Sequence, residues 1–259
     1  FNSDFQPVFD GVVGIKGYGS QDRFKRQTVT FNSDYAIKDW LKIGQALSYT
    51  HTEHAAVTES NEYGSVITNA ILFDPLTPVA YRGNLPDPVN QLVNEGKNLM
   101  KDHQGHYYGI SQVMVGEIIN PFVSRDATQG RTRVDNLFGN LFMDIKPFRG
   151  FTFTSRLGLD VSGLNYHSYN PEYYYNIMAY RDLAVVSDAM SIIRYWQWEN
   201  FANYTRAFAD HAMTFLIGMS ASETKGRVLA GSAGPLVRDT WSFAELDFVT
   251  SPSATDVVT

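Results

Sequence analysis

The sequence predicts an all-β chain, a segment of an antiparallel transmembrane β-barrel with long extracellular loops. Apolar and polar residues alternate with a period of two over several long stretches, which is typical of strands with one apolar and one polar face. Short turn signals join these stretches in pairs. Each stretch matches the roughly 9 to 11 residues of a tilted membrane-spanning strand better than the about 5 to 6 residues of a typical soluble one.

The clearest hairpin consists of two predicted strands, 133–145 and 151–162, joined by a turn at 146–150. In the second strand the apolar residues share one parity: Phe151, Phe153, Leu157, Leu159 and Val161. The other parity carries polar or small residues: Thr152, Thr154, Arg156, Gly158, Asp160 and Ser162. We expect the apolar parity to face lipid and the polar parity to face the barrel lumen.

Two further strand pairs have the same build. The first pair is predicted at 23–37 and 41–51, with its turn at 38–40. The second pair is predicted at 194–206 and 211–221, with its turn at 207–210. Alternation fades after residue 223, although residues 240–249 are compatible with one more strand.

Three long segments lack strand periodicity and are predicted to be extracellular loops: 1–21, 52–132 and 163–193. The middle segment contains five prolines, and short helices are expected in it at 63–72 and 90–102. It is far longer than ordinary connections, which indicates either a functional excursion or a wrong strand assignment around it. Short turns at one end of a sheet and long loops at the other are typical of outer-membrane barrels.

Composition excludes several classes of function. The formal net charge of −6 and the scattered lysines and arginines argue against a nucleic-acid partner. Cysteine is absent, so these 259 residues offer neither a disulfide nor a thiolate metal site. No nucleophile, P-loop or zinc-protease motif occurs, and we expect neither catalysis nor a cofactor. The spacing of His51 with His54, and of His103 with His106, is weak support for a metal site, and none is predicted.

Three segments of the sequence resemble a known family. The segment RFKRQTVTFNSDYAIKDWLKIGQALSYTHTE looks like the barrel region of SusC/RagA-type TonB-dependent transporters. Two more segments resemble later parts of the same barrel, in the same order: NLFGNLFMDIKPFRGFTFTSRLGLDVSGLNYHSYNPEYY and YWQWENFANYTRAFADHAMTFLIGMSASE. Nothing in the chain resembles the plug domain of these transporters, and we expect it to be an internal piece of one.

The resemblance implies a non-enzymatic role in nutrient import across the bacterial outer membrane. Transporters of this family take up oligosaccharides or peptides, are capped by a SusD-like surface lipoprotein, and receive energy from TonB through the plug. The implied partners are therefore that lipoprotein, TonB, outer-membrane lipid and an oligosaccharide or peptide substrate.

Substrate or partner contacts are predicted at the aromatic run of the loop 163–193 and on the lumenal parity. The candidates are Tyr166, Tyr169, Tyr173, Tyr174, Tyr175, Arg156 and Asp160. Packing within the loop is an equally good interpretation of the tyrosines. For Trp196, Trp198, Tyr35 and Tyr49 an interfacial aromatic girdle is favoured over sugar stacking.

One alternative fold is open on the sequence alone. A secreted, soluble β-sandwich that binds carbohydrate would also combine alternating strands with an aromatic content of 14%. The two folds differ in what covers the apolar face: a sandwich packs two such faces together, whereas a barrel turns one belt outward.

Overall fold

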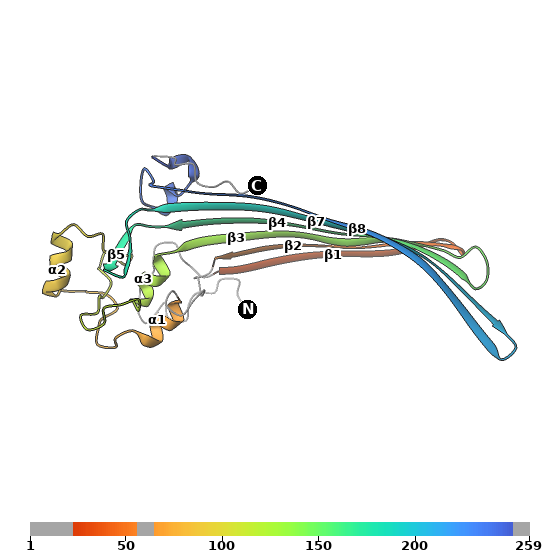
Figure 1. Cartoon of the computed structure of the whole chain (residues 1–259), viewed down its shortest axis with the longest axis horizontal. Coiled ribbons are helices and arrows are strands. Elements are labelled where there is room, and N and C mark those ends of the chain that lie inside the picture. The colour runs from red at the N-terminus through yellow and green to blue at the C-terminus, as the bar shows by residue number, and fades with distance from the viewer. Residues whose placement is uncertain (1–22, 56–64, 251–259) are drawn as a thin grey trace.

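A computed structural model describes residues 23–55 and 65–250 of the chain. Its main feature is one antiparallel sheet of six long strands in the order β1-β2-β3-β4-β7-β8, which lie side by side along the molecule (Figure 1). The strands are β1 (Arg23–Lys38), β2 (Leu41–Ala55), β3 (Gln129–Ile145), β4 (Phe151–Asn170), β7 (Val185–Phe208) and β8 (His211–Ala233). The predicted loop 1–21 lies outside the described residues.

The turns lie where the sequence predicts them, but most strands continue further at the opposite end. The prediction of a loop over 163–193 is wrong at both ends, because β4 continues to Asn170 and β7 begins at Val185. Strand β8 likewise continues to Ala233, past the predicted end at 221. Backbone pairing persists in these extensions, whereas the apolar alternation that marks a strand in the sequence does not.

Continuous register from β2 to β8 keeps each parity on one face of the sheet. Leu141, Leu157 and Trp198 stand beside one another on the apolar face. Phe142, Arg156 and Glu199 form the adjacent row on the other face. The two faces predicted from single strands are therefore properties of the whole sheet.

The β3–β4 turn depends on a glycine. Gly150 has a φ of 88°, and a Cβ at this position would lie 2.3 Å from the carbonyl oxygen of Thr205. Only glycine adopts that backbone region without strain. The close approach lets the turn dock on β7, where the Thr205 amide donates a hydrogen bond of 2.8 Å to the Gly150 carbonyl.

Residues 65–126, between β2 and β3, fold into a layer beyond one end of the sheet (Figure 1). It contains α1 (Val66–Leu72), α2 (Asp87–Asn94) and α3 (Pro121–Asp126). The Ser65 side chain caps α1, and Asn120 caps α3 ahead of a proline at the first helical position. The helix expected at 63–72 is confirmed over its described part. The one expected at 90–102 is confirmed only at 90–94, because α2 ends before Gly96 at a φ of 76°.

This layer, which we call the loop layer (residues 65–126 and 173–181), has its own core. The short hairpin β5 (Tyr173–Asn176) and β6 (Ala179–Arg181) belongs to it. Its buried apolar residues are Val89, Leu99, Tyr108, Ile110, Ile119, Val123 and Tyr175. A packed core of this kind means that the residues predicted as loops form a folded body.

A C-terminal segment, residues 235–250, returns to the same end of the sheet. Two 3-10 turns, η1 (Trp241–Phe243) and η2 (Leu246–Phe248), replace the strand expected at 240–249. Leu236, Ala244 and Trp241 pack on Tyr169 and Val186. The apolar residues of this segment therefore contact the sheet through turns instead of adding a strand.

The sandwich alternative does not describe this chain. In residues 23–55 and 65–250 there is one large sheet and a small two-stranded one, and no second large sheet stacks on the first. Among the same residues no helix is long and apolar enough to cross a membrane.

Candidate functional site

The apolar face of the sheet carries a belt bounded by charged or strongly polar residues. Towards the loop layer the belt ends at Gln27, His51, Asp135, Asn165, Arg194 and Glu223. Between these residues and the turns, the same parity is mostly apolar: Val29, Phe31, Tyr35, Ile43, Tyr49, Leu137, Leu141, Leu157, Leu159, Trp196, Trp198, Phe215, Ile217 and Met219. Many of these are well exposed, with Phe31 at 58% and Ile217 at 75%.

The boundary of the belt runs diagonally across the strands. On β2 and β3 the first polar residues, His51 and Asp135, are direct partners. On β8 the boundary residue Glu223 pairs with Trp196, four residue rows nearer the turns than the row of Asp135. Such an offset is expected where strands tilt relative to the plane of the belt.

Aromatic side chains in this belt satisfy their polar ends locally. The Tyr49 hydroxyl donates to Asp135 at 2.6 Å, and the Trp196 indole NH donates to Glu223 at 3.1 Å. Both rings thus have an apolar body on the belt and a polar tip at its edge, as expected of an interfacial girdle. Trp198 lies deeper, and its NH donates to Ser155 at 3.0 Å.

The opposite face is predominantly polar, and its side chains form hydrogen bonds and ion pairs with one another. Lys42 forms an ion pair with Asp34 at 2.9 Å, and Thr154 donates to Asp144 at 2.7 Å. Further along, Gln197 donates to Glu199 at 2.9 Å. This face offers a row of charged groups and amides to whatever lies next to it.

Both predicted lumenal residues lie on this polar face. Arg156 is half exposed and stands 3.9 Å from Glu199, so its guanidinium keeps free donors. Asp160 lies four residues further along β4 on the same face, beside Phe138 and Tyr195 in the register. The structure places them on one surface but does not join them in one hydrogen-bonded group.

The five predicted tyrosines divide into two groups. Tyr169 and Tyr175 are each 2% exposed. Tyr169 donates to Asp239, and Tyr175 donates to the Gly109 carbonyl at 3.2 Å. Burial, with the Asp239 carboxylate, raises the pKa of Tyr169, and burial raises that of Tyr175 to about 12. Tyr169 and Tyr175 are therefore packed in the protein interior, which is the second interpretation of the sequence.

The other three tyrosines keep accessible surface. Tyr166 is 38% exposed on the polar face of β4. Tyr173 and Tyr174 are half-buried beneath the cations Arg181 and Lys97, which lie 5.4 and 4.8 Å from the ring centroids. No observation tests contact between these residues and a substrate or partner, and it stays a prediction.

A cavity of about 290 Å³ lies where the loop layer meets the C-terminal segment. Its lining includes Lys101, Gln129, Glu172, Asp239 and Trp241. The buried Gln129 Oε1 has no hydrogen-bond partner in the described part of the chain. The cavity therefore lies among charged groups, at the end of the sheet where the loops gather.

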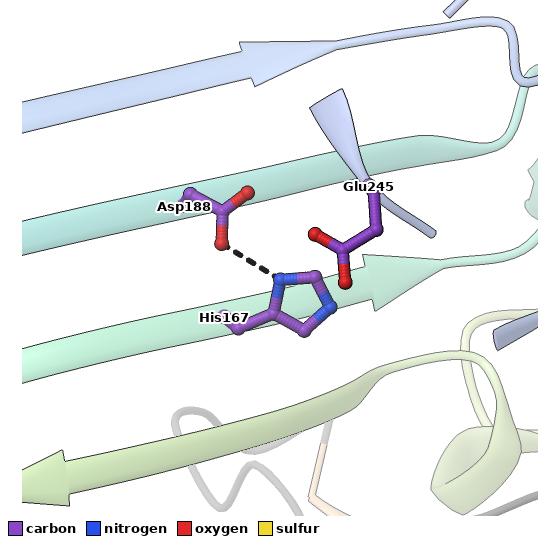
Figure 2. A group of neighbouring side chains, drawn as sticks. All are labelled: His167, Asp188 and Glu245. Atoms are coloured by element: carbon purple, nitrogen blue, oxygen red, sulfur yellow. Dashed lines mark hydrogen bonds and ion pairs between the residues drawn. The ribbon is translucent and has the colours of Figure 1, made fainter. Parts of the chain in front are cut away.

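The histidine spacings noted in the sequence do not assemble a metal site. His51 and His54 have opposite strand parity, so they point to opposite faces of β2. The His106 ring instead donates a hydrogen bond to the Asp102 carboxylate at 3.2 Å. A different group, His167, Asp188 and Glu245, converges near the C-terminal segment (Figure 2).

Several of these contacts are not apparent from local sequence patterns. The pairs Asp34 with Lys42 and Asp144 with Thr154 follow from register, which the turn positions already imply. Glu245 lies more than 50 positions from its neighbours in this group, and no local pattern connects them.

Comparison with known proteins finds no matching family model and no matching curated protein. Solved structures do match. A structure of the RagAB peptide transporter superposes with a TM-score of 0.62 over 90% of this chain, at 19% identity. Structures of the RagAB peptide importer in its open-open and closed-closed states superpose with TM-scores of 0.63, at 18% and 19% identity.

The match spans about a quarter of the solved chains, 24% in each case. At this identity the likeness establishes the fold: the chain adopts the antiparallel β architecture of one part of such a transporter chain.

Proposed function

We propose that this chain forms part of the barrel wall and extracellular loops of a TonB-dependent outer-membrane nutrient importer of the SusC/RagA type, with no catalytic role. The observation that carries the proposal is the bounded apolar belt on one face of the sheet. It lies opposite a polar, hydrogen-bonded face.

Lipid is the medium that suits this belt. Soluble monomers rarely expose a continuous apolar patch beyond a few hundred Å². Here large side chains such as Phe31 and Ile217 are exposed at 58% and 75% without a covering element among the described residues. On each strand the belt approximates the roughly 9 to 11 residues that cross a bilayer at a tilt.

Closure of the wall follows from the same argument. The outer edges of β1 and β8 carry backbone groups that no strand pairs in the described sheet. An unpaired edge in hydrocarbon costs several kcal/mol for each unsatisfied group. Both edges therefore pair with further strands of the barrel in the membrane.

The polar face then lines the transport path. Arg156, Asp160 and Glu199 present charges of both signs, and Gln197 adds an amide. Zwitterionic peptides and polyhydroxylated oligosaccharides both find partners on such a surface. The proteins of similar fold carry peptides, which favours peptides as the substrate.

The loop layer lies on the extracellular side in this proposal. It contributes to the vestibule and to the contact with a SusD-like surface lipoprotein. TonB acts on the transporter through its plug, and this segment provides the wall against which the plug moves.

Introduced thiols test the proposal in living cells. Cysteine is absent from these 259 residues, so Gly158→Cys places a single thiol on the polar face and Leu159→Cys places one on the belt. A Cβ at Gly158 has only ordinary contacts, the nearest at 3.9 Å. We expect a bulky, water-soluble thiol reagent to block peptide uptake through the Gly158→Cys transporter and to leave the Leu159→Cys transporter active.

Equal block of both variants, or of neither, would contradict the assignment of the polar face to the transport path. Parallel uptake of labelled oligosaccharides decides the substrate class without affecting that conclusion.

A further inference from the structure

Three potential ligands converge where the C-terminal segment crosses the sheet. His167 comes from β4, Asp188 from the neighbouring β7, and Glu245 from between η1 and η2. One ligand atom from each residue lies within 4.8 Å of the other two. Figure 2 shows the Glu245 carboxylate turned towards the His167 ring, with Asp188 on its other side.

The three potential ligand atoms lie close enough together to surround a single ion. His167 Nδ1 lies 2.7 Å from Asp188 Oδ1, a hydrogen bond that holds the ring in place. Ligand atoms around a tetrahedral zinc ion stand about 3.4 Å apart, given metal–ligand distances of roughly 2.0 to 2.2 Å. Ligand atoms that lie as close as 2.7 Å and within 4.8 Å of one another therefore shift by roughly 1 Å to reach that separation when an ion binds.

Charge in this group is unbalanced in a way that a divalent cation corrects. Two carboxylates meet one imidazole, and in the described part of the chain neither carboxylate is ion-paired with a lysine or arginine. The cation that stands opposite His167 in the register is Arg131, and its guanidinium instead lies 3.6 Å from Glu53.

Packing supports His167 and the segment that carries Glu245. The ring of Trp241 meets the His167 ring edge-on at 5.2 Å, and Ala244, beside Glu245, is fully buried. Asp239 accepts the Tyr169 hydroxyl and the Glu172 amide, which anchors the start of the segment. Such supporting contacts orient ligands before an ion arrives.

We propose that His167, Asp188 and Glu245 bind a divalent transition-metal cation, with zinc as the best match, and that the ion fastens the C-terminal segment to β4 and β7. A mixed imidazole and carboxylate set favours zinc over calcium or magnesium, which prefer oxygen ligands alone. Three protein ligands leave a fourth position for water. This site is independent of the proposed transport function.

Calorimetry on the full, tag-free protein in detergent tests the site. After removal of metals by a chelator, we expect one equivalent of Zn²⁺ to bind and Ca²⁺ and Mg²⁺ to bind far more weakly. Loss of a ligand in His167→Gln or Glu245→Gln is expected to weaken Zn²⁺ binding by more than the about 10- to 100-fold that loss of a ligand's hydrogen-bond partner typically costs. Asp247→Asn removes an exposed carboxylate of the same segment outside the group, and it is expected to bind as the wild type does.

Trypsin provides a second readout that does not depend on transport. Arg238 is exposed in the C-terminal segment, and we expect Zn²⁺ to slow cleavage after it in the wild type and in Asp247→Asn but not in Glu245→Gln. Because Glu245 is exposed, its variant keeps the fold even if His167→Gln does not. Absence of saturable Zn²⁺ binding, preference for Ca²⁺, or full binding by Glu245→Gln would each overturn the proposal.

Discussion

Gly109 shows how one residue controls the packing of the loop layer. A Cβ at this position would lie 1.7 Å from the carbonyl oxygen of Pro78, a backbone atom that cannot move by itself. Gly109 also supplies the carbonyl that Tyr175 and Asn120 bind. A side chain at position 109 would therefore push the backbone away from Pro78. The Gly109 carbonyl, which accepts hydrogen bonds from Tyr175 and Asn120, would move with it.

We expect Gly109→Ala to destabilise the loop layer by about 1 to 3 kcal/mol, the usual cost of overpacking. Gly83→Ala is the matched control, because a Cβ at Gly83 meets nothing within 4 Å. Limited proteolysis between residues 73 and 115 measures the difference. Equal resistance of the two variants would show that the backbone around Pro78 moves aside without cost.

Asp102 ties the stability of the loop layer to pH. Burial of its carboxyl acts to raise its pKa, but donors outweigh burial and hold the pKa below the ordinary 3.8. These donors are the amides of His106 and Gln104 and the His106 ring. A lowered pKa means that the carboxylate stabilises the fold above pH 3.8 and that this contribution is lost as the pH falls further.

Hydrogen exchange at the His106 amide reports this loss directly, because that amide donates to Asp102 at 2.8 Å. After correction for intrinsic rates, we expect protection to fall below pH 3.8 in the wild type. In Asp102→Asn protection is expected to be lower at neutral pH and nearly independent of pH. Asp182→Asn, which changes an exposed carboxylate, serves as the control; a wild-type profile that stays flat to pH 2 would refute the role of Asp102.

At the scale of single strands, β4 has one side on the apolar belt and the other on the polar face. Leu157 and Gly158 are neighbours at one depth, yet they face the belt and the polar face respectively. We expect Leu157→Arg to cost about 2 to 4 kcal/mol, the penalty for a basic residue in the middle of a lipid-facing strand. Gly158→Arg is expected to cost far less, because Arg156 already occupies the same face.

Unfolding of both variants in detergent or lipid vesicles provides the measurement. A similar cost at the two positions would remove the distinction between the faces. Thr154, also on the polar face, is unsuitable for this comparison, because it is 6% exposed and bonded to Asp144.

Local pattern predicted the hairpins well because their physical causes are local. The alternation from Phe151 to Val161 and the glycine at position 150 lie within one strand and one turn. The end of β4 was misplaced because beyond residue 162 both faces carry polar residues, and a strand there leaves no alternation to detect. Its pairing with β7 continues through backbone hydrogen bonds, which are independent of side-chain polarity.

The loop layer and the group around His167 were not predictable for a different reason. Asn69 accepts from Ile119 at 2.9 Å, and Tyr175 bonds to Gly109, contacts that join positions far apart in sequence. Whether a loop tyrosine is core or surface depends on such partners. Tyr174 and Tyr175 are adjacent in sequence and differ only in the side of β5 from which they project.

At the scale of the whole molecule, the short turns and the loop layer lie at opposite ends of the sheet (Figure 1). If the belt crosses the membrane, the turn after Lys38 faces the periplasm and the loop layer faces outside. A membrane-impermeant maleimide applied to intact cells should therefore label Leu76→Cys, which is 88% exposed, and should not label Lys38→Cys. Both thiols should react after cell lysis; labelling of Lys38→Cys in intact cells would reverse or refute the orientation.

The central claim is that one face of this sheet contacts lipid while the other contacts water. Spin labels placed singly at residues 156–162 of the full-length protein in lipid vesicles measure it through collisions with oxygen, which partitions into lipid, and with a polar nickel reagent. We expect oxygen to be favoured at 157, 159 and 161 and nickel to be favoured at 156, 158, 160 and 162. Uniform exposure to nickel, or protection of the odd positions from both reagents as in a dry protein core, would contradict the claim.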